Sequence, residues 1–161
     1  MKKILSAAAI LLAALCVIGC EKSNTESENN DKVTTGTVPD PEGTVMVNIA
    51  AGNDIEICTT GYIKYTTDEN LLAFSSTYYG QEMTYVGKGN GLGNLKTTII
   101  PSNGWSSKCA AIEGGLYMSR SKNSDLKTYN QYVGIYVVAH NFGSMVTIKF
   151  CPFDPETGAW Q

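Results

Sequence analysis

The residues of this chain that could do chemistry are few: one histidine, five cysteines and fifteen acidic side chains in 161 residues. To act as a general base, His140 would need an orienting partner and a nucleophile within reach. The sequence has neither a Gly-x-Ser-x-Gly turn nor a second histidine. The cysteines also lack the Cys-x-x-Cys spacing of a zinc or redox site. We therefore expect no catalytic residue, no metal site and no cofactor.

Glycoside hydrolysis is the one enzymatic activity that these residues could support, because two acids facing each other across a cleft can hydrolyse a glycosidic bond. The acids inside the expected domain include Glu56, Asp68, Glu69, Glu82, Glu113 and Asp125. Most of them fall in turns or on the solvated faces of expected strands. We expect a non-enzymatic domain, with a small carbohydrate-active enzyme as the alternative.

A glycine-rich segment at residues 87–93 has the composition of a phosphate-binding loop, since clustered glycines let backbone amides approach an anion. Such a loop needs a helix after it. Here the chain continues into the β-branched run 97–100 and then Pro101. We interpret residues 87–93 as a connection rich in turns.

Aromatic residues are the candidates for ligand binding, because nine tyrosines and two tryptophans could form a platform for sugar rings. Tyr78, Tyr79 and Trp105 are the expected exposed ones, and Tyr129 ends the longest polar loop, residues 120–130. Packing in or beside the core is the favoured alternative for all of them, since tyrosine suits strands and has a polar tip.

The N-terminus has the layout of a secretory signal: Lys2 and Lys3, an apolar run over residues 4–18, then Gly19 and Cys20. The run is shorter than the roughly 20 residues that span a bilayer. Residues 17–20, Val-Ile-Gly-Cys, resemble the lipobox of bacterial lipoproteins, in which the cysteine is acylated and then exposed by cleavage. We expect a signal peptide at residues 1–19 and a lipid bilayer as the partner of acylated Cys20.

Residues 20–42 are expected to form a flexible acidic linker. Residues 21–32, EKSNTESENNDK, contain no apolar side chain that could offset the entropy of ordering, and the prolines at 39 and 41 favour extended backbone. Without the signal peptide, which holds two of the twelve basic residues, ten basic residues face fifteen acidic ones, a net charge of −5. That balance and the lack of a basic cluster argue against nucleic acid as a partner.

Short runs with period-two alternation, separated by turn residues, fill the rest of the chain and predict strands. Residues 132–139 are apolar on both alternating faces, which predicts a central strand, whereas residues 145–150 alternate as a strand with one wet face does. We predict an all-β domain over residues 43–153, a two-layer immunoglobulin-like β-sandwich of about seven to nine strands. Residues 154–161 would be a C-terminal tail.

Three cysteines remain once Cys16 leaves with the signal and Cys20 carries lipid: Cys58, Cys109 and Cys151. An envelope compartment permits disulfides. One bridge with a spare thiol, or three reduced thiols, are both compatible with the sequence.

Several short motifs resemble those of small lipoproteins of Bacteroidetes that carry a domain of unknown function. The motifs are Pro-Asp-Pro-Glu-Gly-Thr at 39–44, Gly-Leu-Gly-Asn at 91–94, an Ile-Pro to Gly-Trp segment at 100–105 and a final Pro-Phe at 152–153. Cys109 and Cys151 stand where the family pattern has ordinary strand residues. The resemblance implies a single β domain in the envelope of a gut-type anaerobe, and it brings no site residues.

The function expected from the sequence is therefore that of a non-catalytic binding or accessory module, anchored to the outer membrane and facing a glycan or an envelope protein. A structural component of a surface assembly is a further alternative, which would need an open sheet edge.

Overall fold

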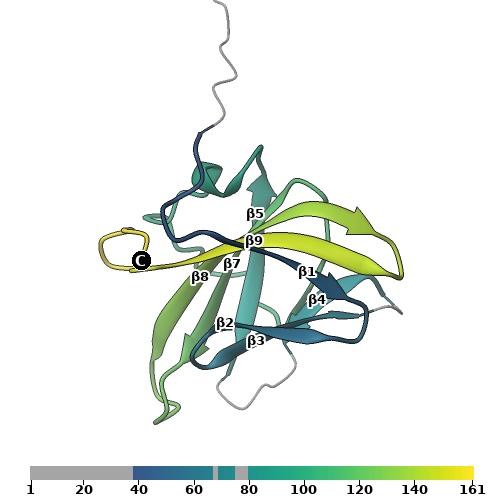
Figure 1. The fold of residues 1–161 in the computed structure, drawn as a ribbon. Helices are drawn as coiled ribbons and strands as arrows, with labels where there is room; N and C mark the ends of the chain where they lie inside the picture. The colour runs from purple at the N-terminus through teal and green to yellow at the C-terminus, as the bar shows by residue number, and fades with distance from the viewer. Residues whose placement is uncertain (1–37, 67–68, 75–79) are drawn as a thin grey trace, which may run out of the picture. The chain divides into compact units, whose positions relative to one another are not determined.

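The computed structural model describes residues 38–66, 69–74 and 80–161. All of the described residues belong to one compact unit. This unit is a two-layer β-sandwich with nine strands among the described residues, which confirms the expected all-β architecture (Figure 1). In chain order the elements are β1 (Val45–Ala50), β2 (Asp54–Cys58), β3 (Gly61–Thr66), β4 (Leu71–Phe74), β5 (Glu82–Lys88), the 3-10 turn η1 (Leu92–Asn94), β6 (Lys108–Ala110), β7 (Gly115–Lys122), β8 (Tyr129–Asn141) and β9 (Met145–Phe153).

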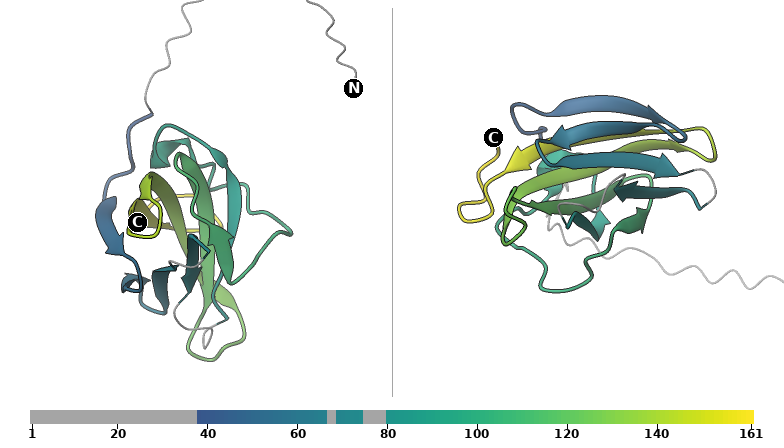
Figure 2. Two further views of the ribbon diagram at one scale, coloured as in Figure 1. Left: turned by 90° about the vertical axis from the view of Figure 1, so that its right-hand side faces the viewer. Right: turned by 90° about the horizontal axis from the view of Figure 1, so that it is seen from below.

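Two antiparallel sheets form the layers, one in the order β1-β9-β8-β7-β5 and the other in the order β2-β3-β4-β6. Strand β8 is the third of five strands, so the central position predicted for residues 132–139 is confirmed. Figure 2 shows the sheets from two further sides, with β1 at the margin of the five-stranded sheet in its left view. The longest antiparallel ladder in the two sheets joins β8 to β9.

The main core lies between the sheets because strand side chains alternate between faces with period two. On β8, Val133, Ile135 and Val137 are all at most 1% exposed and meet the inner residues of the other sheet. The largest side chains that the opposite sheet contributes to this core are Ile57, Ile63, Tyr65, Leu72 and Phe74.

A second, smaller core covers the outer face of the five-stranded sheet. Met118 and Phe153 project there, and Leu92 and Leu95 from the connection after β5 pack onto them. Trp160 closes the cluster, with its ring 5.7 Å from that of Phe153. The five-stranded sheet is thus apolar on both faces, which explains why both sets of residues in β8 are apolar.

Gly134 in β8 shows how tightly this second cover is packed. A Cβ atom built there would lie 2.7 Å from Leu95 Cδ2 and 2.7 Å from Trp160. Only glycine leaves room for both side chains over the sheet. Residues 154–161, expected as a tail, thus include Trp160, which packs on the domain.

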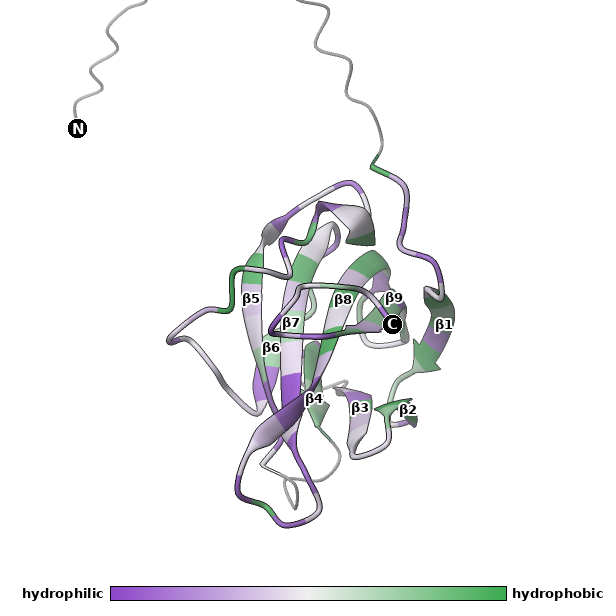
Figure 3. Ribbon diagram, turned by 90° about the vertical axis from the view of Figure 1, so that its left-hand side faces the viewer, coloured by the Kyte–Doolittle hydropathy of each residue, from purple (hydrophilic) through white to green (hydrophobic). Residues whose placement is uncertain are grey.

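Arg120 and Tyr129, expected in one polar loop, are strand residues. Strand β7 extends to Lys122 and β8 begins at Tyr129, so the connection is only residues 123–128. Figure 3 shows the hydrophilic residues gathered on this β7–β8 hairpin. Polar residues can continue the ladder here because their backbones still pair. The side chains of Arg120 and Lys122 are partly exposed, and the buried Ser121 hydroxyl lies 2.7 Å from the Thr60 hydroxyl.

Candidate functional site

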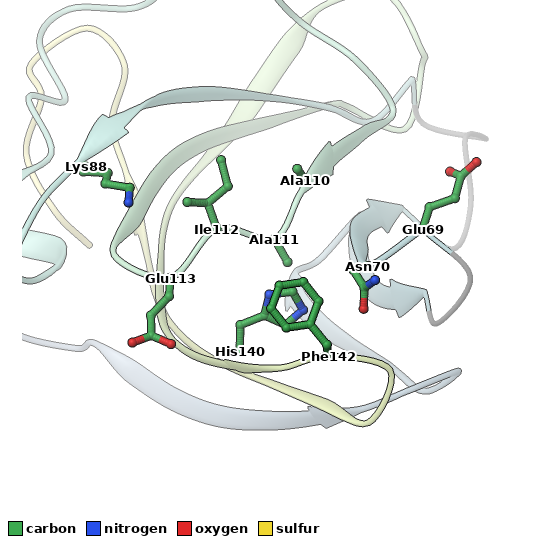
Figure 4. Close-up of a pocket in the computed structure, with 9 residues that line it drawn as sticks. All are labelled: Glu69, Asn70, Lys88, Ala110, Ala111, Ile112, Glu113, His140 and Phe142. Carbon is green, nitrogen blue, oxygen red and sulfur yellow. The ribbon is translucent and has the colours of Figure 1, made fainter. Parts of the chain in front are cut away.

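A pocket of about 410 Å³ opens where the β8–β9 turn meets the segment after β6 and the start of β4 (Figure 4). Its volume falls in the range of roughly 300–1,000 Å³ that is common for small-molecule sites. The residues that line it are Glu69, Asn70, Lys88, Ala110, Ala111, Ile112, Glu113, His140 and Phe142. Alanine and isoleucine form an apolar wall, and the charged residues lie around it.

His140 lines this pocket and is held by a buried tyrosine from the other sheet. The Tyr65 hydroxyl lies 2.7 Å from His140 Nε2, and the two rings meet edge to face with centroids 5.4 Å apart. Tyr65 is 0% exposed, so its hydroxyl depends on protein partners. The imidazole is therefore fixed in place before any ligand arrives.

The hydrogen bonds around Tyr65 determine which nitrogen of His140 carries a proton. The Gly143 amide can only donate, and it lies 2.9 Å from Asn70 Oδ1, which is therefore an acceptor. The Tyr65 hydroxyl, 2.8 Å from the same oxygen, must donate its one proton to it. Its lone pairs are then left for the Gly143 amide at 3.1 Å and for His140 Nε2, which must be protonated. In the neutral imidazole, Nδ1 is then an acceptor.

Phe142 presents the largest exposed apolar side chain beside this imidazole. Its side chain is 73% exposed, and its ring lies over the His140 ring with centroids 4.2 Å apart and planes 35° apart. In Figure 4 the two rings overlap in projection, beside Ala111. An aromatic ring held in water by a neighbouring ring is a ready contact surface for an apolar ligand face.

The apolar wall of the pocket is held by Tyr117. Its hydroxyl donates to the Ala110 carbonyl at 2.6 Å and accepts from the Ile112 amide at 2.9 Å. Burial raises the pKa of Tyr117 to about 12, against the hydrogen bond from Ile112. The hydroxyl therefore stays protonated at neutral pH and keeps residues 110–112 in place.

Charged groups at the pocket rim do not converge. Glu69 forms an ion pair with Lys108 at 2.7 Å, and both side chains are more than half exposed. Glu113 and Lys88 lie at the other end of the pocket from Glu69 in Figure 4, and the two carboxylates point away from each other. Within residues 38–66, 69–74 and 80–161, no group of three His, Cys, Asp or Glu side chains could hold a metal ion.

Two of the four predicted ligand-binding residues come together, but in a different place. The Arg120 guanidinium lies 4.0 Å from the Trp105 ring centroid and 4.0 Å from that of Tyr129. Glu82 accepts from Arg120 Nε at 3.1 Å and from its terminal nitrogen at 2.7 Å. Tyr78 and Tyr79 lie outside the described residues, as does Cys20.

Glu82, Trp105, Arg120 and Tyr129 form a stacked cluster in which the side chains contact one another. One face of each ring is occupied by the guanidinium, and the Trp105 indole donates to the Pro101 carbonyl at 2.8 Å. The pKa of Tyr129 is raised, first by burial and then by its hydrogen bond to Glu82. Packing at the rim of the core, the alternative weighed for Trp105, accounts for these contacts, since Trp105 also packs against the second core.

The pocket and the stacked cluster lie at opposite ends of β8. Tyr129 and His140 are the first and the last but one of its 13 residues, so at about 3.3 Å per residue they are roughly 36 Å apart. In the sequence His140 has no recognisable partner, and Phe142 is not among the four predicted ligand-binding residues. The partner, Tyr65, is 75 positions away in the chain and leaves no local signal.

The glycine-rich segment binds a carboxylate of this same chain. The Leu92 amide, at the start of η1, donates to Asp40 Oδ1 at 3.0 Å, and Lys149 pairs with the other Asp40 oxygen. A Cβ atom at Gly93 would lie 2.2 Å from the Pro39 carbonyl, so glycine is required where residues 38–40 cross the loop. The segment works as a clamp for residues 38–40, which belong to the expected linker.

The three thiols are free in the structure: Cys58 and Cys109 are half-buried and Cys151 is buried. Burial raises the pKa of each thiol above its usual value, although hydrogen bonds oppose the shift. Because the thiolate is the reactive form, these cysteines are poor nucleophiles at neutral pH.

Comparison with protein-family models, curated proteins and solved structures gives no match. In the part of the chain that the structure describes, no helix is long and apolar enough to cross a membrane. Function is therefore inferred from the geometry of the pocket.

Proposed function

We propose that this domain is a non-catalytic module that binds glycans, carried by a lipoprotein that acylated Cys20 anchors to the outer membrane. The observation that supports this proposal is the exposed Phe142 ring stacked on a fixed His140, both of which line the pocket. The lipobox-like residues 17–20 and the polar residues 21–32 support the anchor and its tether.

A sugar ring matches the mixture of groups in this pocket. One face of a pyranose is a sheet of C–H groups, which can stack on an exposed aromatic ring such as Phe142. Its hydroxyl groups need fixed partners. His140 Nδ1 and the Glu113 carboxylate offer acceptors at the pocket, and the Asn70 amide nitrogen offers a donor, because Asn70 Oδ1 already accepts from Tyr65 and Gly143. A few polar groups around an apolar wall is the usual design of a small-molecule site.

A carbohydrate-active enzyme is the second candidate, since Glu69 and Glu113 line the same pocket. Two catalytic carboxylates must face each other across the bond that is cleaved, at a separation of about 5–10 Å. Glu69 is instead engaged with Lys108, and Glu113 points away from it in Figure 4. The arrangement favours binding over hydrolysis.

The test is a glycan array probed with residues 21–161, followed by calorimetric titration of each ligand found. Phe142→Ala should weaken binding at least about tenfold, because it removes the stacking surface. Tyr129→Phe is the matched control at the other end of β8 and should bind like the parent chain.

Glu113→Gln separates the two candidates. Binding without turnover, with Glu113→Gln altering affinity only, supports the binding module. Hydrolysis of an array glycan that disappears in Glu113→Gln would make the protein an enzyme and overturn the proposal.

A further inference from the structure

Strand β1 differs from the other three sheet edges. The edge strand β2 carries Asp54 and Glu56, the short β6 begins with Lys108, and β5 has a bulge between Tyr85 and Gly87. Charges, short length and bulges are the devices by which proteins prevent edge-to-edge association. Strand β1, VMVNIA, has none of them, and its register with β9 is continuous over all six residues.

The backbone of β1 has polar groups directed to the open side. The Ala51 amide donates to the Ser144 carbonyl at 2.7 Å, in the same register that pairs β1 with β9. Because hydrogen-bonded and non-bonded positions alternate in an antiparallel ladder, Met46 and Asn48 direct their N–H and C=O groups away from β9. No strand among the described residues pairs with β1 on that side, and Figure 3 shows it at the margin of the sheet.

Two side chains of β1 are also more exposed than their type favours. Met46 is 62% exposed on the outer face. Val45 is 48% exposed although it projects to the same side as the buried Ile49. The inner row of β1 therefore ends in an apolar residue that the domain does not cover.

We propose that β1 is the docking edge for β1 of a second copy of this chain, paired antiparallel about a two-fold axis. The pairing joins the two five-stranded sheets into one continuous sheet. Centred on Val47, it places Val45 of one copy opposite Ile49 of the other, and Met46 opposite Asn48. The exposed end of the inner row is then covered, and the outward N–H and C=O groups are bonded.

The character of β1 favours a second copy of this chain as its partner. A strand that adds here must be uncharged and regular, since a charge opposite Val45 or Met46 would lose water without gaining a partner. Among the sheet edges of the described part, only β1 has that character. The edge is therefore complementary to itself, and a two-fold dimer covers β1 of both copies at once.

The experiment is sedimentation equilibrium of residues 21–161, which contain all of the described residues, over a wide concentration range. The parent chain should show a reversible monomer–dimer equilibrium. Asn48→Pro removes one outward N–H per copy and leaves the β9 ladder intact, since proline is tolerated on an edge. Loss of two hydrogen bonds should weaken the dimer about thirtyfold.

Met46→Lys is a second variant that needs no backbone change, because lysine on an edge opposes pairing. Ile99→Lys is its matched control: Ile99 is 61% exposed, against 62% for Met46, and lies outside the strands. Each variant is first checked by thermal unfolding. A parent chain that stays monomeric at every concentration would overturn the proposal, and so would a dimer that persists in both Asn48→Pro and Met46→Lys. A dimer that Ile99→Lys also disrupts would place the contact elsewhere.

Discussion

The two ends of strand β8 carry aromatic residues in opposite states. At the Tyr129 end, two rings enclose the Arg120 guanidinium, and Glu82 completes its hydrogen bonding. At the His140 end, Phe142 rests on a fixed imidazole with most of its surface in water. At the Tyr129 end, the ring faces and the guanidinium contact each other within the protein. At the His140 end, one face of the Phe142 ring is exposed beside a pocket.

This contrast shows why the number of aromatic residues is a poor guide to a binding site. Trp105 and Tyr129 have the composition expected of a sugar platform, yet their rings are used to bury a cation. Phe142 is a single ring, but its partner is another flat ring beneath it, so its outer face is available. What matters is whether the protein already occupies the surface that a ligand would need.

The largest effect on stability should come from removing the cation that the stacked cluster encloses. Arg120→Met should lower the free energy of unfolding by about 2 kcal/mol, from two cation–π contacts and a half-buried ion pair. Arg120→Lys should recover only part of this, because an ammonium cannot stack between two rings. Urea denaturation measures both, and glycan affinity should not change. A variant with normal stability and lost affinity would show that the ligand binds at the cluster.

The next effect concerns the hydrogen bonds that fix the imidazole. Tyr65→Phe should cost about 1–2 kcal/mol of unfolding free energy, because His140 Nε2 loses its acceptor and Asn70 loses a donor. It should also weaken glycan binding, since the imidazole is no longer held. Calorimetric titration and urea denaturation would measure the two losses. Unchanged glycan affinity would show that the hydrogen bonds of Tyr65 do not contribute to binding in the pocket.

Alkaline pH should loosen the pocket wall. Tyr117 has a pKa raised to about 12 in the folded chain, above the ordinary value of 10.0. A raised pKa means that its contribution to stability is full below about pH 10 and is lost as pH rises through 12. Thermal unfolding between pH 9 and pH 12, compared with Tyr117→Phe, should show a smaller pH-dependent decline in the variant. Identical declines would mean that other groups govern the alkaline transition.

The smallest effect on stability should be that of Phe142. Phe142→Ser removes a ring that is 73% exposed, so the free energy of unfolding should change by no more than about 0.5 kcal/mol. A loss comparable to that of Arg120→Met would show that Phe142 is structural, and the contrast between the two ends of β8 would fail.

The sequence by itself determined the fold class and the position of the central strand, but not where β7 ends and β8 begins. Alternating apolar residues, the two apolar faces of residues 132–139 and the turn residues between the runs are sufficient to predict a β-sandwich with a central strand there. Side-chain period and turn chemistry are local properties of the chain. The same local reasoning showed that residues 87–93 precede no long helix. It could not show that Asp40 binds the Leu92 amide, since the two residues are 52 positions apart.

Only the tertiary structure decided which aromatic residue is free. Trp105 and Tyr129 are brought to Arg120 by the pairing of β7 with β8 and by the connection before β6, while Tyr65 reaches His140 from the opposite sheet. These contacts join residues on different strands and connections, and their distances depend on register and on the packing of two layers. A sequence pattern specifies which face of a strand a side chain occupies, but not which side chain from another strand will cover it.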